Sequence, residues 1–590
     1  MASSDNLPSL ADIICAAMSS HWGLTALHDI QINTIGLLTA PFVANAASVF
    51  VSFPTGYGKT AIMQGSATIL GGVMLVLCPT IGLAADQTAS LNGPQRHVVS
   101  LPWVKGRDSK KYCQELLKIA QFAPSEREIV FLIATPETIK KKMWKKCIEI
   151  LIDKGCISLF VCDELHLHLQ HARFRTDEYK VVTEIIKLIT DQKKIPFLAM
   201  TATMLPGDLI KLETKYNTQF CRVWASPDQM AQRHITLELV PIVASHFTQA
   251  FKGSLKIFIS DQMRRSRKCV LFVNAKCDID GLLEHVFDVF NCVCPDKKLF
   301  AVAIHGDLNP DDKRVNTDLF CATCNPTLNT ENSENINLNA TLPSLQHRTY
   351  MAVATGECFN AGVHCPDVGA GFHKGMVPSL YSFRQSFGRL GRSAEAAQEK
   401  LTFTIYPNLS DISYQLMRSF ENKDSLHEVM EMIQFVGLQR TCWHHFLEKR
   451  FGNPEIASTL PLTCGSNCPA CSGQMKQLDL KLDKNALKTT LDTLLGQGPL
   501  PLFPDFLDAM KKESITKIVF KCAKKQKTVT AVERLCTQVI ACGLIEPLRV
   551  MNPTTRKYEA CVGLARGPTP SQIAIHFDNQ KWTHLRAYFS

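Results

Sequence analysis

The stretch Val51–Thr60, VSFPTGYGKT, decides the fold expected of this sequence, because an apolar run leads into a glycine-containing turn and then a helical pattern. Backbone N–H groups in such a turn, together with the positive end of the helix, can hold phosphate oxygens. Lys59 is expected to reach the β- and γ-phosphates of ATP, and the Thr60 hydroxyl to ligate Mg²⁺. The strict phosphate-loop pattern fails only at Phe53, where it has glycine, and a purely structural turn is the alternative. The candidate nucleotide-binding residues of this stretch are Thr55, Gly56, Gly58, Lys59 and Thr60.

An acidic pair follows another apolar run at Leu159–His166, LFVCDELH. Asp163 is expected to hold Mg²⁺ through water, and Glu164 to polarise the attacking water. His166 is placed to connect this site to a neighbouring loop. The alternative is that the two carboxylates only cap the following helix. Together with the lysine-containing turn, the pair predicts an ATP-hydrolysing site.

Apolar runs outside these two segments alternate with helical patterns and form two series. Such runs, each bounded by polar or turn residues, are typical of strands buried on both faces of a parallel sheet. The sequence therefore predicts two α/β units in tandem, joined near Val223–Ile235. The first series is Ser48–Phe53, Val73–Cys78, Ile129–Ala134, Ile157–Cys162 and Pro196–Met200, and the second is Cys269–Val273, Leu299–Ile304, Tyr350–Ala354 and Leu401–Ile405.

Composition narrows the class of protein. The chain has 590 residues, 46% hydrophobic and 20% charged, which excludes a mainly disordered or collagen-like chain. No apolar run is long enough to span a bilayer, and the first residues do not form a secretion signal, so we expect neither a membrane nor a secreted protein. The 23 cysteines are therefore expected to be reduced thiols or metal ligands.

Positive charge is concentrated at the end of the chain. The net charge is +10, and Ser472–Ser590 contains 18 Lys and Arg against 10 Asp and Glu. Within this part, Val529–Cys542 has helical spacing, and two strand-like runs follow at Glu546–Met551 and Tyr558–Leu564. A helix followed by a hairpin with basic residues predicts a winged helix. Candidate contacts to duplex phosphates are Lys521, Lys524, Lys525 and Lys527.

A cluster of four cysteines has the spacing C-x21-C-x3-C-x2-C. Four thiolates in this arrangement suit a tetrahedral structural Zn²⁺. Four unrelated buried cysteines are the alternative, and His444 and His445 are expected to be ordinary helix residues and not ligands. The predicted ligands are Cys442, Cys464, Cys468 and Cys471.

Two arginines, Arg389 and Arg392, lie in Gln385–Arg392, QSFGRLGR, within the second α/β unit. An arginine supplied from a second domain can meet the γ-phosphate and make hydrolysis depend on closure. A salt-bridging role on a helix is the alternative for both.

These blocks, in this order, resemble a superfamily 2 helicase, and specifically the RecQ family of ATP-dependent DNA helicases. The resemblance covers roughly Trp22–Cys471 and implies that Gln31 reads adenine and that Gln385 also belongs to the nucleotide site. It further implies 3′→5′ translocation on single-stranded DNA. The other similar blocks are Cys78–Gln87 (motif Ia), Ala134–Thr138 (Ib), Met200–Thr203 (III), Val273–Lys276 and Ile304–Leu308 (IV), Ala354–Val368 (V) and Gln385–Arg392 (VI).

The sequence departs from the family in the loop after the acidic pair, Asp163–Tyr179, DELHLHLQHARFRTDEY. RecQ enzymes have an aromatic-rich loop here that senses single-stranded DNA. In this chain His171 stands where the family has Trp, and the Phe174-Arg175 pair is shifted by one residue. This puts the coupling of DNA binding to ATP turnover in doubt.

Three further features are open to more than one interpretation. Lys140–Lys146, KKKMWKK, could contact nucleic acid through Trp144, or Trp144 could turn inward from a solvated helix face. Cys321-x-x-Cys324 could bind a second metal, but free cysteines are favoured. An Asn-rich stretch between Cys321 and His347 is expected to be a surface loop.

We therefore expect an α/β protein with two tandem RecA-like parallel-sheet domains, followed by a helical zinc-binding subdomain and a winged-helix-like domain. The expected ranges are 1–222, 223–412, 413–475 and 476–590. The expected function is that of an ATP- and Mg²⁺-dependent DNA helicase that unwinds duplexes and junctions in nuclear DNA repair or recombination. The alternatives are a nucleic-acid-binding protein or DNA-stimulated ATPase that does not unwind, and an RNA-directed helicase of the same superfamily.

Overall fold

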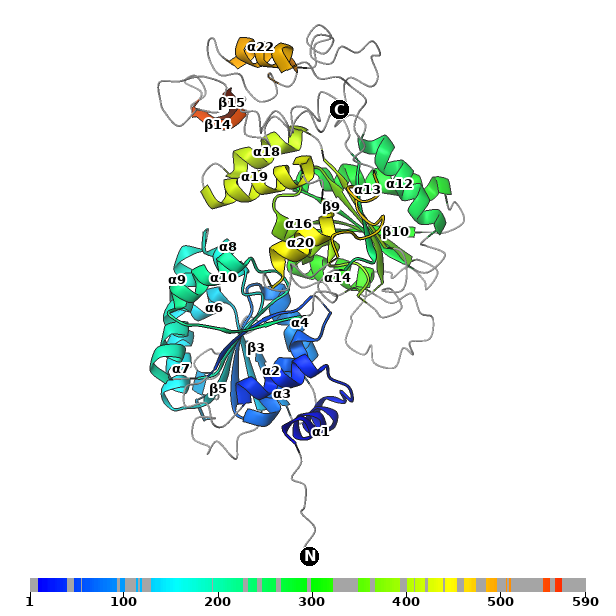
Figure 1. Ribbon diagram of the computed structural model, residues 1–590. Helices are drawn as coiled ribbons and strands as arrows, with labels where there is room; N and C mark the ends of the chain where they lie inside the picture. The colour runs from blue at the N-terminus through cyan, green and yellow to red at the C-terminus, as the bar shows by residue number, and fades with distance from the viewer. Residues whose placement is uncertain are drawn as a thin grey trace, which may run out of the picture. The chain divides into compact units, whose positions relative to one another are not determined.

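The computed structural model (Figure 1) describes residues 9–39, 47–54, 56–92, 96–100, 129–173, 175–193, 195–225, 232–240, 247–261, 267–293, 299–321, 348–360, 367–392, 401–407, 409–419, 423–438, 441–453, 461–473, 484–495, 545–551 and 558–564, with a few single positions between them. The chain divides into two compact units, and the main division between them lies at Gln232 and Arg233. Residues 447–453, later in the chain, also group with the first unit. The main division lies within the join predicted near Val223–Ile235. The narrower limit of 222 falls inside a strand of the first unit, Cys221–Trp224.

The first unit is built on a parallel sheet with the order β3-β4-β2-β5-β6-β1-β7. Its central strands are buried along their whole length and are almost entirely apolar, as the sequence predicted for strands covered on both faces. The strands are β1 (Ser48–Ser52), β2 (Val73–Leu77), β3 (Arg96–Ser100), β4 (Ile129–Ala134), β5 (Ile157–Cys162), β6 (Phe197–Thr201) and β7 (Cys221–Trp224).

Helices cover both faces of this sheet, and alternate residues of each strand enter two separate cores. On one face, Val49 and Val51 of β1 pack with the helices α1 (Leu10–Trp22), α2 (Asp29–Thr39), α3 (Lys59–Leu70) and α4 (Ile81–Leu91). On the other face, Phe50 packs with α7 (Lys142–Asp153), α9 (Thr176–Lys187) and α10 (Pro206–Tyr216). Figure 1 shows the blue helices on one side of the sheet and the cyan and green helices on the other. Two short helices, α6 (Pro136–Ile139) and α8 (Leu167–Gln170), follow β4 and β5.

The second unit contains a second parallel sheet, with the order β10-β11-β9-β12-β13-β8. Its core packs β9, β11 and β12 against the first two helices of the unit. The strands are β8 (Ile235–Leu239), β9 (Lys268–Val273), β10 (Leu299–Ile304), β11 (Arg348–Thr355), β12 (Val368–Lys374) and β13 (Leu401–Tyr406). The helices are α12 (Phe247–Asp261), α13 (Ile279–Val293), α14 (Pro310–Cys321), α15 (Gly356–Asn360), α16 (Leu380–Phe387), α18 (Leu409–Ser419) and α19 (Lys423–Leu438), with α20 (Trp443–Phe451) and α22 (Lys484–Leu495) after them.

Two tandem RecA-like parallel sheets are therefore confirmed. The predicted hairpin is also present, as the antiparallel pair β14 (Ile545–Met551) and β15 (Tyr558–Leu564). The predicted helix Val529–Cys542, the four lysines at 521–527 and the Asn-rich stretch lie outside the described residues, so the winged helix stays a prediction. None of the helices in the described part of the chain is both long and apolar enough to cross a membrane.

Candidate nucleotide site and metal centre

The loop between β1 and α3 has the backbone shape that its glycines permit. Gly56 and Gly58 have φ values of 86° and 75°, in the left-handed region that side chains disfavour. Helix α3 starts at Lys59 without a side-chain cap, so the first-turn N–H groups of a 12-residue helix face the loop. Lys59 Nζ donates to the carbonyl oxygen of Phe53 at 3.2 Å. These features fit a phosphate group, since positive dipole, ammonium and backbone donors converge. Thr55 lies outside the described residues.

Gln31 connects the start of α2 to this loop. Its side chain is 4% exposed, and Nε2 donates to the carbonyl oxygens of Tyr57 and Gly58 at 3.1 and 3.2 Å. Its Oε1 accepts from the backbone N–H of His28 at 2.8 Å. A Cβ at Gly58 would lie 2.4 Å from Gln31 Nε2, so only glycine allows this approach. The His28 and Tyr57 rings stack with centroids 4.6 Å apart. The structure thus brings the residue predicted to read adenine next to the phosphate loop.

The acidic pair lies at the carboxyl end of β5. Asp163 is 5% exposed, and its two carboxylate oxygens accept from Gln87 Nε2 and from the backbone N–H of Glu164, both at 2.9 Å. Glu164 has a φ of 48°, a conformation that costs energy for a residue with a side chain. Backbone strain of this kind is concentrated at functional sites in proteins.

The Thr201 hydroxyl, at the carboxyl end of β6, joins the acidic pair to the next loop. It lies 2.7 Å from His166 Nδ1 and 3.3 Å from Glu164 Oε2. It also contacts the carbonyl oxygen of Thr203 at 3.0 Å and accepts from the Thr203 N–H at 3.1 Å. The predicted connection of His166 to a neighbouring loop is therefore present, and the loop is Met200–Thr203.

Burial changes the protonation of this site. The pKa of Asp163 is raised to about 6 because the carboxyl is buried and lies beside Glu164, while Lys59 and Gln87 act in the opposite direction. The pKa of His166 is lowered to about 4, mainly by burial. At pH 7 the imidazole is therefore neutral, and the site holds two carboxylates close to one ammonium group. A divalent cation that binds such carboxylates would relieve their repulsion.

Residues 29–210 match the family model described as DEAD/DEAH box helicase. They include every side chain of the site just described except His28. Residues 29–210 form a DEAD/DEAH box helicase domain.

The chain is also 20% identical to "ATP-dependent DNA helicase Q-like 2" of Arabidopsis thaliana, over 81% of this chain and 62% of the relative. It is 22% identical to "ATP-dependent helicase wrn-1" of Caenorhabditis elegans, over 71% of this chain and 35% of the relative. The chain thus spans less than two thirds of the length of either curated relative. A solved structure of the "DUF1998 helicase MrfA bound to DNA" aligns with 73% of this chain and 54% of its own, with 14% identity and a TM-score of 0.47.

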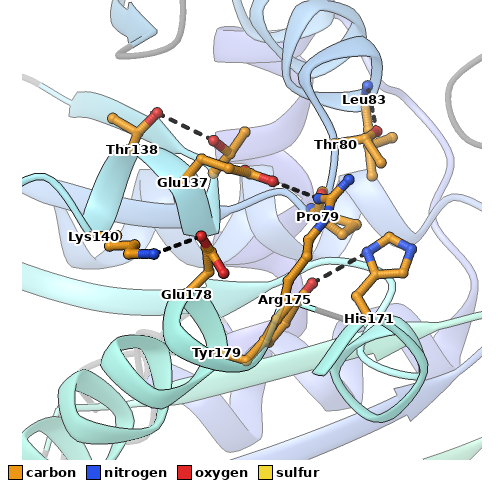
Figure 2. Close-up of polar contacts among 11 residues, drawn as sticks. Pro79, Thr80, Leu83, Glu137, Thr138, Lys140, His171, Arg175, Glu178 and Tyr179 are labelled. Carbon is orange, nitrogen blue, oxygen red and sulfur yellow. Dashed lines mark hydrogen bonds and ion pairs between the residues drawn. The ribbon is translucent and has the colours of Figure 1, made fainter. Parts of the chain in front are cut away.

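Within the helicase domain, the loop after the acidic pair is held by contacts that the sequence did not reveal. Arg175 Nη1 forms an ion pair with Glu137 of α6 at 2.5 Å and lies 3.4 Å from the carbonyl oxygen of Pro79 (Figure 2). The Tyr179 hydroxyl lies 3.5 Å from His171 Nδ1. Figure 2 shows Arg175 reaching from this loop toward both segments. One arginine therefore joins the altered loop to the segments that resemble motifs Ia and Ib.

The same loop is anchored on its inner side. His168 is fully buried, and its Nδ1 lies 2.6 Å from the hydroxyl of Tyr216 at the end of α10. Its ring also packs edge-on against Tyr179. Burial lowers the pKa of His168 to about 3, so the ring is neutral at physiological pH. His168 is thus a structural anchor two residues after His166.

Trp144 belongs to the core of the helicase domain. It is 3% exposed and packs with α9 and α10, so the inward orientation is correct. The neighbouring Lys140 and Lys145 form ion pairs with acidic residues of α9, at 2.9 Å to Glu178 and 2.8 Å to Glu184. This segment is a solvated helix face with an inward tryptophan.

In the second unit, Gln385 lies on α16, and Arg389 and Arg392 follow that helix. Arg392 Nε donates to the carbonyl oxygen of Gly388 at 3.5 Å. Gly391 has a φ of 64°, and a Cβ there would lie 2.3 Å from Leu401. The glycine between the two arginines is therefore required by close packing on β13. The roles of the three polar residues stay predictions.

The four predicted zinc ligands come together in the second unit. The Sγ atoms of Cys442, Cys464, Cys468 and Cys471 all lie within 4.8 Å of one another. Zinc with four sulfur ligands at about 2.3 Å places them about 3.8 Å apart, so the cluster fits a tetrahedral Zn²⁺. Cys468 Sγ accepts from the N–H groups of Trp443 and Cys471, each at 3.4 Å. These bonds and the Cys442 thiol, which acts most strongly, lower the pKa of Cys468 to about 4.

The cysteine cluster packs next to the edge strand of the second sheet. The carbonyl oxygen of Asn467 accepts from the N–H of Leu237 on β8 at 2.9 Å. The same oxygen lies 3.2 Å from Nε2 of His444, which is buried and 1% exposed. His444 is therefore occupied by a backbone contact, in agreement with its exclusion as a ligand. A metal held here would stabilise the residues that extend the second sheet.

Proposed function

We propose that this chain is an ATP- and Mg²⁺-dependent DNA helicase. The observation that carries the proposal is the arrangement at the carboxyl edge of the first sheet, where the lysine loop, the acidic pair and Thr201 meet. Lys59 and the α3 N-terminus would hold the ATP phosphates, and Asp163 would hold the water-ligated Mg²⁺. Glu164 would accept the proton of the attacking water, since its carboxylate is fixed beside the Thr201 hydroxyl. Gln31 would turn from the loop carbonyls toward the adenine base.

Thr201 offers a route from ATP chemistry to nucleic acid. Its hydroxyl is shared by Glu164 and His166, and it begins the Thr201–Thr203 turn. A change in the charge of Glu164 during hydrolysis would therefore alter the hydrogen bonds of the loop after β6. In this proposal Gln385, Arg389 and Arg392 bind the same ATP, and Zn²⁺ holds the four-cysteine cluster.

DNA as the substrate is supported by the printed name of the Arabidopsis relative and by the basic C-terminal part. Translocation in the 3′→5′ direction, action at duplex junctions in repair or recombination, and a nuclear location follow from the same resemblance. Each belongs to the proposal and requires its own measurement.

A second candidate is a DNA-stimulated ATPase that does not unwind. It is favoured by the loop after the acidic pair, where His171 replaces tryptophan and is turned to Tyr179. Arg175 in the same loop is engaged with Glu137 and Pro79. A loop held in this way would have to exchange partners before DNA could act through it.

The experiment is an ATP hydrolysis assay on the zinc-loaded chain, with no nucleic acid, single-stranded DNA or single-stranded RNA. Strand separation is measured in parallel on duplexes with a 3′ or a 5′ tail. The helicase proposal expects stimulation by DNA and separation of the 3′-tailed duplex. Stimulation without separation would select the second candidate, and stimulation by RNA alone would replace DNA as the substrate. An absence of hydrolysis under all conditions would overturn both.

A further inference from the structure

A pair of thiols lies beside a buried lysine in the second unit, and neither thiol belongs to the four-cysteine cluster. Cys321 is the last residue of α14, and Cys365 lies shortly before β12. A hydrogen bond joins the two thiols. Cys365 Sγ also lies 3.8 Å from the carbonyl oxygen of Phe320, the residue that precedes Cys321. Two segments about 45 residues apart in sequence thus meet through their sulfur atoms.

The lysine of this cluster is Lys268, at the start of β9. Its side chain is fully buried, and its ammonium group contacts the carbonyl oxygen of Phe320. Its Nζ lies 3.3 Å from Asp367 and 4.0 Å from Cys365 Sγ. A buried lysine needs such partners to stay charged. Neither Lys268 nor the two thiols has a role in the proposed ATP hydrolysis.

The two thiols differ in exposure and in charge. Cys321 is half-buried, whereas Cys365 is 3% exposed. The pKa of Cys321 is lowered by the Cys365 hydrogen bond and by Lys268, against burial and the charges of Asp318 and Asp367. The pKa of Cys365 is raised, first by the bond to Cys321 and then by burial. Cys321 is therefore the more acidic and the more exposed thiol of the pair, and we expect it to be the one that reacts first with a dissolved oxidant.

We propose that Cys321 and Cys365 are a redox-active pair that hydrogen peroxide converts into a disulfide. The Cys321 thiolate attacks the peroxide O–O bond, and with one proton taken up it becomes a sulfenic acid and releases water. Cys365 then attacks the Cys321 sulfur, the S–O bond breaks, and the hydroxyl leaves as a second water with the Cys365 proton. Overall, two thiols lose two electrons and two protons to one peroxide. A dithiol reductant reverses the reaction by exchange.

The disulfide would join two segments that are already neighbours in the fold. The two thiols are hydrogen-bonded to each other, and a disulfide requires their sulfur atoms to approach to about 2.05 Å. The bond would fix the end of α14 to the chain immediately before β12. It would thereby tether, at Cys365, the connection between β11 and β12, which lies within the block Ala354–Val368.

The chain contains a natural comparison in Cys113 and Cys147 of the first unit. These two thiols are also joined by a hydrogen bond, and both are buried. Among the described residues, no cation acts on the pKa of either thiol. Burial raises the pKa of Cys113, and burial together with the neighbouring Cys113 raises the pKa of Cys147 to about 12. Neither is a thiolate near pH 7, so this pair is expected to stay reduced under the same oxidant.

The test is peptide mapping by mass spectrometry of the full-length, zinc-loaded chain after limited hydrogen peroxide, with free thiols blocked before digestion. We expect a disulfide between Cys321 and Cys365 that dithiothreitol removes, and no bond between Cys113 and Cys147. The tryptic peptides also contain Cys324 and Cys358, so fragment spectra must assign the bonded sulfurs. Cys324→Ser and Cys358→Ser are the matched controls and should retain the cross-link.

Two variants separate the steps. Cys365→Ser should leave Cys321 as a sulfenic acid that a dimedone probe traps, whereas Cys321→Ser should abolish both the cross-link and the trapping. A cross-link of Cys321 to Cys324, or a Cys365 that remains a free thiol while exposed Cys221 and Cys277 are oxidised, would overturn the proposal. The mapping of the wild-type chain does not depend on ATP hydrolysis or on the folding of any variant.

Discussion

Two consecutive segments of the helicase domain, Asp163–His166 and Leu167–Tyr179, use their polar side chains differently. In the first, Asp163, Glu164 and His166 contact groups at the carboxyl edge of the sheet. In the second, His168 and Arg175 contact helices and loops farther from the lysine loop. The first segment therefore has the geometry of a chemical site, and the second that of a mechanical connection. The comparison predicts that damage to the first abolishes turnover, whereas damage to the second alters its response to DNA.

The largest effect on ATP hydrolysis is expected from substitution of Lys59, whose charge acts on Asp163 of the first segment. Lys59→Ala removes the ammonium that we propose faces the ATP phosphates, and loss of one such charged donor should lower kcat by about 100-fold or more. Steady-state ATP hydrolysis with saturating single-stranded DNA measures it. The matched control is Lys211→Ala, which removes an exposed lysine paired with Asp208 at 2.8 Å on α10. Turnover that survives the Lys59 change would contradict the assigned phosphate site.

A smaller and more selective effect is expected in the second segment. Arg175→Ala removes the only side chain drawn in Figure 2 that joins this loop to both Pro79 and Glu137. Basal hydrolysis should stay within about twofold, while stimulation by DNA should fall about tenfold, equivalent to about 1.4 kcal/mol of coupling. Measuring ATP hydrolysis with and without DNA in the same preparation separates the basal rate from its stimulation by DNA.

Arg222→Ala is the control for Arg175, because it breaks a comparable ion pair with Glu213, 2.7 Å long, at the edge strand β7. It should leave both rates unchanged. An Arg175 variant that loses basal and stimulated hydrolysis equally would place this loop in the chemical site and remove the distinction between the two segments.

The pH dependence sharpens the description of the first segment. Asp163 has a folded pKa of about 6, above its ordinary value, so its carboxylate takes up a proton as pH falls through 6, and the proposed Mg²⁺ ligand would then be lost. Affinity for Mg·ATP should therefore fall about tenfold per pH unit below about 6. The sign for folding is opposite: the buried carboxylate destabilises the fold above pH 6, and protonation relieves this cost as pH falls toward 4. Binding titrations from pH 5 to 8 measure the first effect.

Glu164→Gln provides the comparison, since its charge helps to raise the pKa of Asp163. In this variant the loss of Mg·ATP affinity should move to lower pH, although hydrolysis itself stops. An unshifted profile would show that another group controls binding at acidic pH.

The sequence predicted most strands of the two sheets and the chemical segment because both are local patterns, but it missed β3, β7, β8 and β12. Uniformly apolar runs mark central strands, and the lysine loop and acidic pair each fit within ten residues. The strand β12 was missed because Gly371 and His373 interrupt its pattern. A Cβ at Gly371 would lie 2.5 Å from Phe403, so the glycine reflects packing on β13. The edge strand β7 was missed because it is short and partly exposed.

The contacts that sequence reasoning missed join residues far apart in the chain. Gln87 bonds to Asp163 across 76 residues, and Arg175 pairs with Glu137 across 38. Neither partner stands in a pattern of its own; only the packing of β4 and α6 beside the loop brings Glu137 within reach. Gln87 ended a block that resembled motif Ia, which was the one available signal for it.

The smallest effect concerns how the second segment is anchored. Tyr216→Phe removes the hydroxyl that contacts His168 Nδ1 while keeping the buried ring. His168 Nε2 has no hydrogen-bond partner among the described residues, so the variant leaves the imidazole without one. Leaving one buried polar group unpaired costs about 1–3 kcal/mol, and thermal unfolding should move to lower temperature by a few degrees.

Tyr414→Phe, at a ring that is 41% exposed, should leave the melting temperature unchanged. Because His168 is two residues from His166 but has no hydrogen bond to Glu164 or Lys59 in the described part of the chain, basal hydrolysis below the melting temperature should be preserved. If Tyr216→Phe instead reduced basal hydrolysis at full stability, the anchor would belong to the chemical segment, and the boundary between the two would lie after His168.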